Sequence, residues 1–124
     1  MIIVLLPAYN EEESLPALMP KLRIVLESMA EDYRVLVCDD GSRDHTGEQL
    51  LAYAKEMPLE ILDHSINRGL GETSRDLFER ASEIAEDDDV IIRLDCDDTH
   101  EPEFIPTLIE KLRSGYDVVI ASRF

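Results

Sequence analysis

An apolar run that ends in carboxylates is the first feature of this sequence that could do chemistry. Residues 90–94 read Val-Ile-Ile-Arg-Leu, and Asp95, Cys96, Asp97 and Asp98 follow at once. Because side chains two apart on an extended chain share a face, we expect Asp95 and Asp97 to point the same way, about 6 to 7 Å apart. Carboxylate oxygens are the ligands that Mg²⁺ or Mn²⁺ prefers. The run therefore predicts a divalent-metal site, with a solvated acidic turn as the alternative that these residues alone leave open.

Short apolar runs of this kind recur along the chain and indicate the strands that would position such a site. Continuous apolar runs of four or five residues are typical of strands buried on both faces of a parallel sheet. Polar residues follow the first four runs, including Asn10 after the first and Asp39 and Asp40 after the second. The expected strands are residues 2–6, 34–38, 59–62, 90–94 and 117–121.

The segments between these runs carry apolar residues at helical spacing. We expect one helix from about Leu15 to Met29, with Ser14 as its N-cap and Pro16 in its first turn. Pro20 predicts a kink or a later start, because proline removes a helical hydrogen bond. The other expected helices cover residues 45–56, a segment through residues 77–84 that follows the glycine-bearing loop 67–71, and a segment from residue 102 that ends before Gly115.

Alternation of strands with helices predicts an α/β fold with a doubly wound, mostly parallel, Rossmann-like sheet and helices on both faces. In such sheets ligands bind beyond the carboxyl ends of the strands, where the strand order reverses. The polar segments all follow strand ends and should meet at one rim. His45, His64 and His100 are scattered, and we expect them to be surface or turn residues without a ligand.

The composition bounds the classes of function. At 124 residues we expect a single domain, and 28 acidic against 12 basic residues give a net charge of −16. Nucleic acids and anionic membranes bind basic patches, so neither is an expected partner, and an anionic ligand would need a cation. No apolar run reaches the roughly 18 residues of a membrane span. Cys38 and Cys96 end different strands and should stay reduced, which predicts a cytoplasmic protein.

Five motifs in order resemble the family-2 inverting glycosyltransferases of the GT-A fold, with dolichyl-phosphate mannose synthase-like members closest in style. The resemblance covers essentially the whole chain. It is carried by Pro-Ala-Tyr-Asn-Glu-Glu at 7–12, Asp-Asp-Gly-Ser at 39–42 with Asp44 and Thr46, Asn-x-Gly-x-Gly at 67–71, Leu-Asp-Cys-Asp-Asp at 94–98 with Pro102, and Asp-Val-Val at 117–119 with Ser122 and Arg123.

The resemblance implies a role for each motif. Tyr9 would pack on a nucleotide base, Asp39 would bind the base edge, and Pro7, Glu11 and Val37 would complete the nucleoside pocket. Asp95 and Asp97, with Cys96 between them, would hold Mg²⁺ or Mn²⁺ on the diphosphate of a UDP- or GDP-sugar, and Arg123 would meet the phosphates from the other side.

The resemblance also implies what this chain would lack. Family members usually continue past the Ser-Arg pair into a segment that supplies the acceptor site and the catalytic base. We therefore expect residues 1–124 to be the donor-binding half, with the catalytic base unknown and with a lipid phosphate, which is membrane-borne, or a saccharide as acceptor. Glu72, Thr73, Arg75 and Asp76 depart from the small residues that the family usually carries there.

Three other classes of protein remain as alternatives. A phosphorelay receiver domain would need paired acids after the first strand and a Lys after the fifth, whereas Tyr9 follows the first and no Lys lies beyond Lys111. A sugar-nucleotide pyrophosphorylase would need a first loop rich in glycine and lysine, which is absent. A non-catalytic nucleotide-sugar binding module has the same motifs as the donor-binding half, so the residues do not separate the two.

Overall fold

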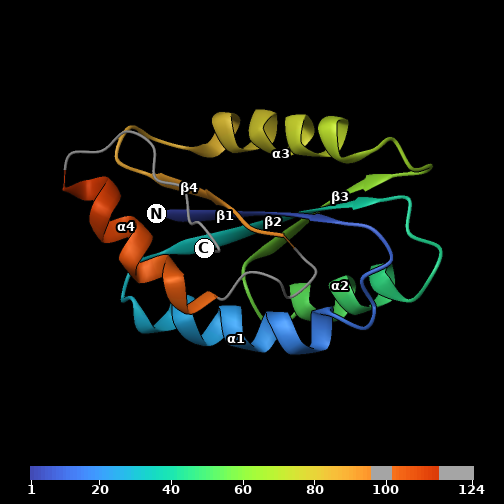
Figure 1. The fold of residues 1–124 in the computed structure, drawn as a ribbon, viewed down its shortest axis with the longest axis horizontal. Coiled ribbons are helices and arrows are strands. Elements are labelled where there is room, and N and C mark those ends of the chain that lie inside the picture. The colour runs from blue at the N-terminus through green and yellow to red at the C-terminus, as the bar shows by residue number, and fades with distance from the viewer. Residues whose placement is uncertain (96–101, 115–124) are drawn as a thin grey trace, which may run out of the picture.

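The computed structural model describes residues 1–95 and 102–114, which form a parallel sheet covered by helices on both faces (Figure 1). The predicted α/β architecture is confirmed. Residues 117–121, the expected fifth strand, lie outside the described part. In chain order the elements are β1 (Ile2–Ala8), α1 (Leu15–Ser28), β2 (Tyr33–Asp40), α2 (Thr46–Ala54), β3 (Leu59–His64), α3 (Leu70–Ile84), β4 (Val90–Arg93), a 3₁₀ turn (Pro102–Phe104) and α4 (Ile105–Arg113).

The strand order is β3-β2-β1-β4, and the pairings of β1 with β2, β1 with β4, and β2 with β3 are all parallel. The chain adds β2 and β3 on one side of β1 and then places β4 on the other side. This reversal opens a crevice beyond the carboxyl ends of β1 and β4, where doubly wound sheets bind ligands.

Side chains of each strand alternate between the two faces of the sheet, and each face has its own core. On one face, Val35 and Val37 of β2 pack with buried residues of α1, α2 and α4. On the other face, Leu36 and Cys38 pack against Leu77 of α3. Figure 1 shows α3 alone on its side of the sheet. The same alternation sends the next two residues of β2, Asp39 and Asp40, to opposite faces.

The helix α1 runs from Leu15 to Ser28 with Pro20 inside it. The expected later start is therefore wrong. Pro20 is exposed, so the carbonyl that loses its helical partner lies where water can bond to it, and the cost of the proline is reduced. Ser14 takes the N-cap position, but its side chain makes no capping hydrogen bond. Among the described residues, no helix is long and apolar enough to cross a bilayer.

Candidate functional site

A cavity of about 390 Å³ lies beyond the carboxyl ends of β1 and β4. Four residues that the sequence predicted for nucleotide-sugar binding line it: Pro7, Tyr9, Glu11 and Asp95. The remaining lining residues come from the end of β1, the end of β2, and the loop and first turn of α3. They are Ala8, Asp40, Asn67, Gly69, Leu70 and Thr73.

Hydrogen bonds to the turn after β2 fix the segment that carries Tyr9 and Glu11. The Oγ of Ser42 accepts the Asn10 N–H at 2.9 Å, and the Oγ1 of Thr46 accepts the Glu11 N–H at 2.8 Å. Asn10 has a φ of 51°, a left-handed conformation that asparagine tolerates better than most residues. The segment after β1 is therefore held to the neighbouring strand end, with Tyr9 43% exposed beside the cavity.

The turn after β2 depends on Asp39, Gly41 and Asp44. Asp39 is buried, and its Oδ1 accepts the Ser42 N–H at 3.1 Å. Gly41 has a φ of 71°, and a Cβ there would lie 2.6 Å from the backbone nitrogen of Asn67. Asp44 Oδ1 accepts the Thr46 N–H at 2.9 Å, so this carboxylate bonds the first residue of α2, while His45 takes the N-cap position. Glycine at 41 is what lets the turn approach the loop before α3.

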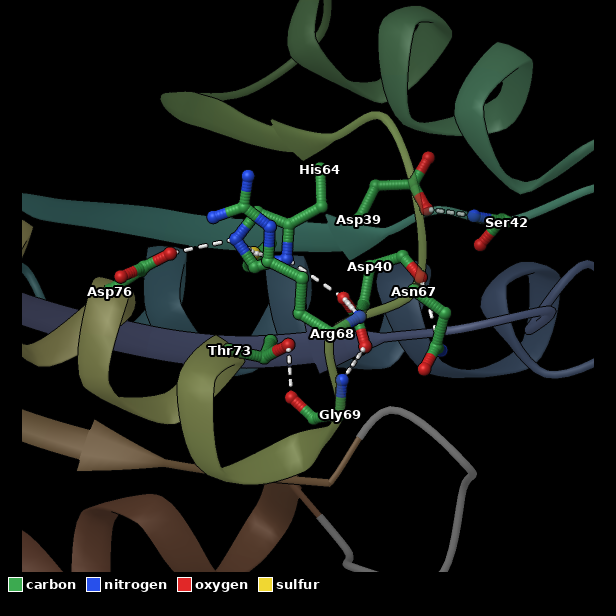
Figure 2. Close-up of polar contacts among 10 residues, drawn as sticks. Asp39, Asp40, Ser42, His64, Asn67, Arg68, Gly69, Thr73 and Asp76 are labelled. Atoms are coloured by element: carbon green, nitrogen blue, oxygen red, sulfur yellow. Dashed lines mark hydrogen bonds and ion pairs between the residues drawn. The ribbon is translucent and has the colours of Figure 1, made fainter.

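A buried polar cluster on the α3 side joins β2, β3 and α3 (Figure 2). His64 Nδ1 lies 2.8 Å from Asp40 Oδ1, and His64 Nε2 lies 2.7 Å from Asp76 Oδ2. The two strands bring His64 and Asp40 together because these residues are register partners. The expectation that His64 is a surface or turn residue is wrong. β3 continues to His64, which is 8% exposed on the same face as Leu62.

Asp40 also holds the glycine-bearing loop. Its Oδ1 accepts the Arg68 N–H at 2.8 Å and its Oδ2 accepts the Gly69 N–H at 2.9 Å. The Asn67 side-chain amide donates to the Asp40 carbonyl at 3.2 Å. Gly69 has a φ of 96° and a ψ of 162°, a region that glycine alone adopts readily. The Thr73 hydroxyl donates to the Gly69 carbonyl at 2.8 Å and completes the first turn of α3.

The ionisation of this cluster follows from its contacts. Burial opposes ionisation of Asp40, but hydrogen bonds from His64, Arg68 and Gly69 outweigh it and lower the pKa of this carboxyl. The hydrogen bond to Asp40 raises the pKa of His64 against the effect of burial, and the contact with Asp76 adds to the rise. The structure thus favours a carboxylate at 40 and an imidazolium at 64.

The other predicted site residues lie elsewhere. Val37 is fully buried in the core on the α1 and α2 side, so its side chain does not line the cavity. Asp39 faces the turn rather than the cavity wall. Cys96, Asp97 and Arg123 lie outside the described residues, as does the predicted pair of Asp95 with Asp97. Within residues 1–95 and 102–114, no three His, Cys, Asp or Glu side chains come together to hold a metal ion.

The residues present still suit a hard divalent cation. Glu11 and Asp95 place carboxylates on the cavity wall, and such oxygens are the donors that Mg²⁺ and Mn²⁺ prefer. Asp95 Oδ1 lies 3.5 Å from an Arg93 nitrogen, and its side chain is 37% exposed. None of the described residues that line the cavity is Lys or Arg, so the site would need a cation to accept a diphosphate.

Comparison with known proteins fits this geometry. A family model described as Glycosyl transferase family 2 matches residues 3–124. The chain belongs to this family. The predicted resemblance to family-2 glycosyltransferases is thereby confirmed, whereas the closer likeness to dolichyl-phosphate mannose synthases stays a prediction.

Solved structures share the fold of this family-2 glycosyltransferase chain. S. aureus TarS 1-349 in complex with UDP-GlcNAc has a TM-score of 0.68 and 21% identity over 91% of this chain and 31% of its own. Glucosyl-3-phosphoglycerate synthase from Mycobacterium tuberculosis, in complex with Mn²⁺, UDP and phosphoglyceric acid, has a TM-score of 0.66 and 22% identity. The match covers 93% of this chain and 39% of the synthase. The mannosyltransferase PcManGT from Pyrobaculum calidifontis, in complex with GDP-Man and Mn²⁺, has a TM-score of 0.61 and 20% identity. The match covers 90% of this chain and 32% of the mannosyltransferase. The chain thus spans about a third of these proteins.

The family and the strand order exclude the phosphorelay alternative. Receiver domains have the flavodoxin-like strand order 2-1-3-4-5, whereas the order here is β3-β2-β1-β4, as in dinucleotide-binding sheets.

Sequence reasoning missed Asp40, His64 and Asp76 as parts of the site. A signal for His64 was present, because continuing the alternation of Glu60 and Leu62 by one step puts His64 on the same face of the sheet.

Proposed function

We propose that this chain binds the donor in a metal-dependent, inverting glycosyltransferase that uses a UDP- or GDP-sugar. The observation that carries the proposal is the cavity at the β1 and β4 ends. There an aromatic residue (Tyr9), the glycine-bearing loop and an acidic residue (Asp95) line the same cavity. The solved structures with UDP-GlcNAc, UDP or GDP-Man support a nucleoside-diphosphate sugar as ligand.

In this proposal each part of the cavity meets one part of the donor. Tyr9 packs on the base, Pro7 and Glu11 border the nucleoside, and the backbone of Val37 and the carboxylate of Asp39 lie behind it. Asp39 donates nothing when ionised, so it would accept an N–H from the base edge. The loop 67–70 would lie at the phosphate end, and the resemblance assigns Arg123 to the phosphates as well. The amide groups of a glycine loop can approach an anion closely because no Cβ intervenes.

The charge of the site explains why a cation is needed. Glu11, Asp40 and Asp95 line the cavity, and these carboxylates would repel a diphosphate. Asp95, Asp97 and Cys96 form the segment that would hold Mg²⁺ or Mn²⁺. When bound, the cation would neutralise the charge that develops on the departing diphosphate. The solved structures that contain Mn²⁺ support this assignment.

Transfer also needs an acceptor and a base. The base must lie within hydrogen-bond reach of the acceptor hydroxyl or phosphate. The carboxylates that line the described cavity are at the nucleotide end, where a cation would make them poor bases. We propose that the 124-residue chain binds donor and transfers sugar slowly or not at all, and that a lipid phosphate or a saccharide is the acceptor. A cytoplasmic location stays a prediction.

Calorimetry with UDP and GDP tests donor binding. The affinity should fall at least about tenfold when Mn²⁺ is removed with a chelator, a change of about 1.4 kcal/mol. Asp95→Asn should abolish the response to Mn²⁺, whereas Asp87→Asn, which removes one negative charge from an exposed position before β4, should leave it intact. Equal affinity with and without metal would exclude Asp95 as a ligand.

Chromatography of the donor tests transfer. With a polyprenyl phosphate or a saccharide acceptor, the purified chain should consume UDP- or GDP-sugar with less than one turnover, and a longer chain that includes a downstream segment should turn over repeatedly. Tight donor binding without transfer by the longer chain would favour the second candidate, a non-catalytic nucleotide-sugar binding module. Multiple turnovers by residues 1–124 would place the base within them.

A further inference from the structure

His64 is a buried imidazole with a carboxylate at each nitrogen (Figure 2). Nδ1 lies 2.8 Å from Asp40 and Nε2 lies 2.7 Å from Asp76, and the side chains of His64 and Asp40 are 6% and 5% exposed. A neutral imidazole carries one N–H and can donate to only one carboxylate, whereas the cation donates to both. The geometry therefore fits a doubly protonated His64.

The groups around His64 favour this charge. From β2, Asp40 and the Cys38 thiol face the ring, with Cys38 Sγ 3.7 Å from Nε2. From α3, Asp76 faces it, and from the loop before α3, Arg68 opposes the charge. Burial raises the pKa of Cys38 to about 12, so the thiol stays neutral while His64 titrates. The imidazole of His64 is thus faced by two carboxylates, which favour its positive charge, and by one Arg, which opposes it.

The carboxylate that His64 binds is the one that holds the cavity wall. Asp40 Oδ1 contacts His64 and accepts the Arg68 N–H, while Oδ2 accepts the Gly69 N–H. The neighbouring residues Asn67, Gly69 and Leu70 line the cavity. At the other nitrogen, Asp76 belongs to α3, the helix that begins at Leu70. One imidazole therefore connects the strand end, the loop and the helix.

We propose that His64, as a cation that bridges Asp40 and Asp76, is a positioning residue that holds the loop 67–70 in the geometry that receives a diphosphate. When His64 loses this proton, either Asp40 or Asp76 loses its hydrogen bond from the imidazole. The loop then opens more often, and the affinity for the nucleotide-sugar falls. The identity of the ligand rests on the proposed function, whereas the ordering of the loop does not.

Amide hydrogen exchange, followed by NMR, tests the loop without any ligand. The N–H groups of Arg68 and Gly69 should open at least about tenfold more often, after correction for the intrinsic exchange rate, once the pH exceeds the pKa of His64 measured on the same sample. In His64→Gln these two N–H groups should open at the higher frequency at every pH. The amides of β1 and β2 should stay protected in both proteins. Protection of Arg68 and Gly69 that ignores both the pH and the substitution would overturn the inference.

A second variant separates positioning from a merely structural role and serves if His64→Gln fails to fold. Asp76→Asn removes one carboxylate from His64 but keeps the Asp40 contact, so the pH midpoint of loop opening should move down. Glu79→Gln removes a charge from the same helix at an exposed position and should leave the midpoint unchanged. Equal midpoints in all three proteins would overturn the inference.

Calorimetry with UDP or GDP and Mn²⁺ connects the loop to the ligand. Between pH 6 and pH 8.5 the affinity of the wild type should fall by about tenfold more than that of His64→Gln, a comparison that cancels titration of the nucleotide itself. Equal losses in the two proteins would overturn the link between His64 and donor binding. If no nucleotide binds at any pH while the loop still follows His64, the proposed function fails and the positioning role stands.

Discussion

The Asp40 carboxylate accepts the backbone N–H of Gly69 at 2.9 Å and so ties the end of β2 to the first turn of α3. Asp40 is 4% exposed, and its other oxygen meets His64 and the Arg68 N–H. A single side chain thus sets the position of the loop on the cavity wall. Removing any one of these three donors should cost stability, because a buried carboxylate that loses a partner keeps its desolvation penalty.

Replacing Asp40 by Asn should destabilise the fold by about 1 to 3 kcal/mol, because the amide NH₂ would face a buried N–H or the imidazole. Urea unfolding followed by circular dichroism measures the change. Asp63→Asn, at an exposed position one residue before the end of β3, is the matched control and should stay within about 0.5 kcal/mol of the wild type. Similar stability of both variants would contradict the role given to Asp40.

Two glycines at the start of α3, one at its N-cap and one in its first turn, should respond in opposite ways to alanine. Gly69→Ala should cost about 1 to 3 kcal/mol, because its φ of 96° and ψ of 162° lie in a region that side chains avoid. Gly71→Ala should be neutral or stabilise the fold by up to about 1 kcal/mol, because Gly71 lies within α3 and no atom stands within 4 Å of an added Cβ. Thermal unfolding checks both, and an equal effect would refute the conformational argument.

The pH dependence of stability should report His64. Because its pKa is raised on folding from 6.5, its contribution is fully present below pH 6.5 and is lost as the pH rises through the folded value. The pKa of Asp40 is lowered from 3.8, so its contribution is present above that pH and is lost as the pH falls through the folded value. The stability difference between wild type and His64→Gln should be largest from about pH 4 to 6.5. A difference that is flat from pH 4 to pH 9 would contradict a raised pKa of His64, and a difference that grows as the pH rises would show that the imidazole is neutral in the fold.

Asp39→Asn separates the turn from the proposed base contact. Asn keeps an oxygen for the Ser42 N–H, which Asp39 Oδ1 accepts at 3.1 Å, but presents an NH₂ group where an acceptor for the base edge is needed. Stability should change by less than about 1 kcal/mol, while UDP or GDP affinity should fall by about 1 to 3 kcal/mol. Asp39→Ala should lower both the stability and the UDP or GDP affinity, because it removes both oxygens. Unchanged affinity in a folded Asp39→Asn protein would remove this residue from the base pocket.

The amino-acid sequence by itself determined the parallel α/β fold, because strand and helix periods are written locally, as in Ile2–Leu6 and Leu15–Leu26. It also placed Pro7, Tyr9, Glu11 and Asp95 at one rim, since carboxyl ends of parallel strands meet at one edge. What it could not decide was which neighbour each polar side chain meets.

That decision belongs to the tertiary structure. Asp39 and Asp40 are adjacent in the chain, but β2 sends them to opposite faces, one into a turn and the other to His64 and the loop. His64 pairs with Asp40, 24 positions away in the sequence, because β3 lies beside β2 in a register that no local pattern fixes. Sheet register and helix packing decide which carboxylate meets the imidazole of His64, and both depend on contacts between residues far apart in the sequence.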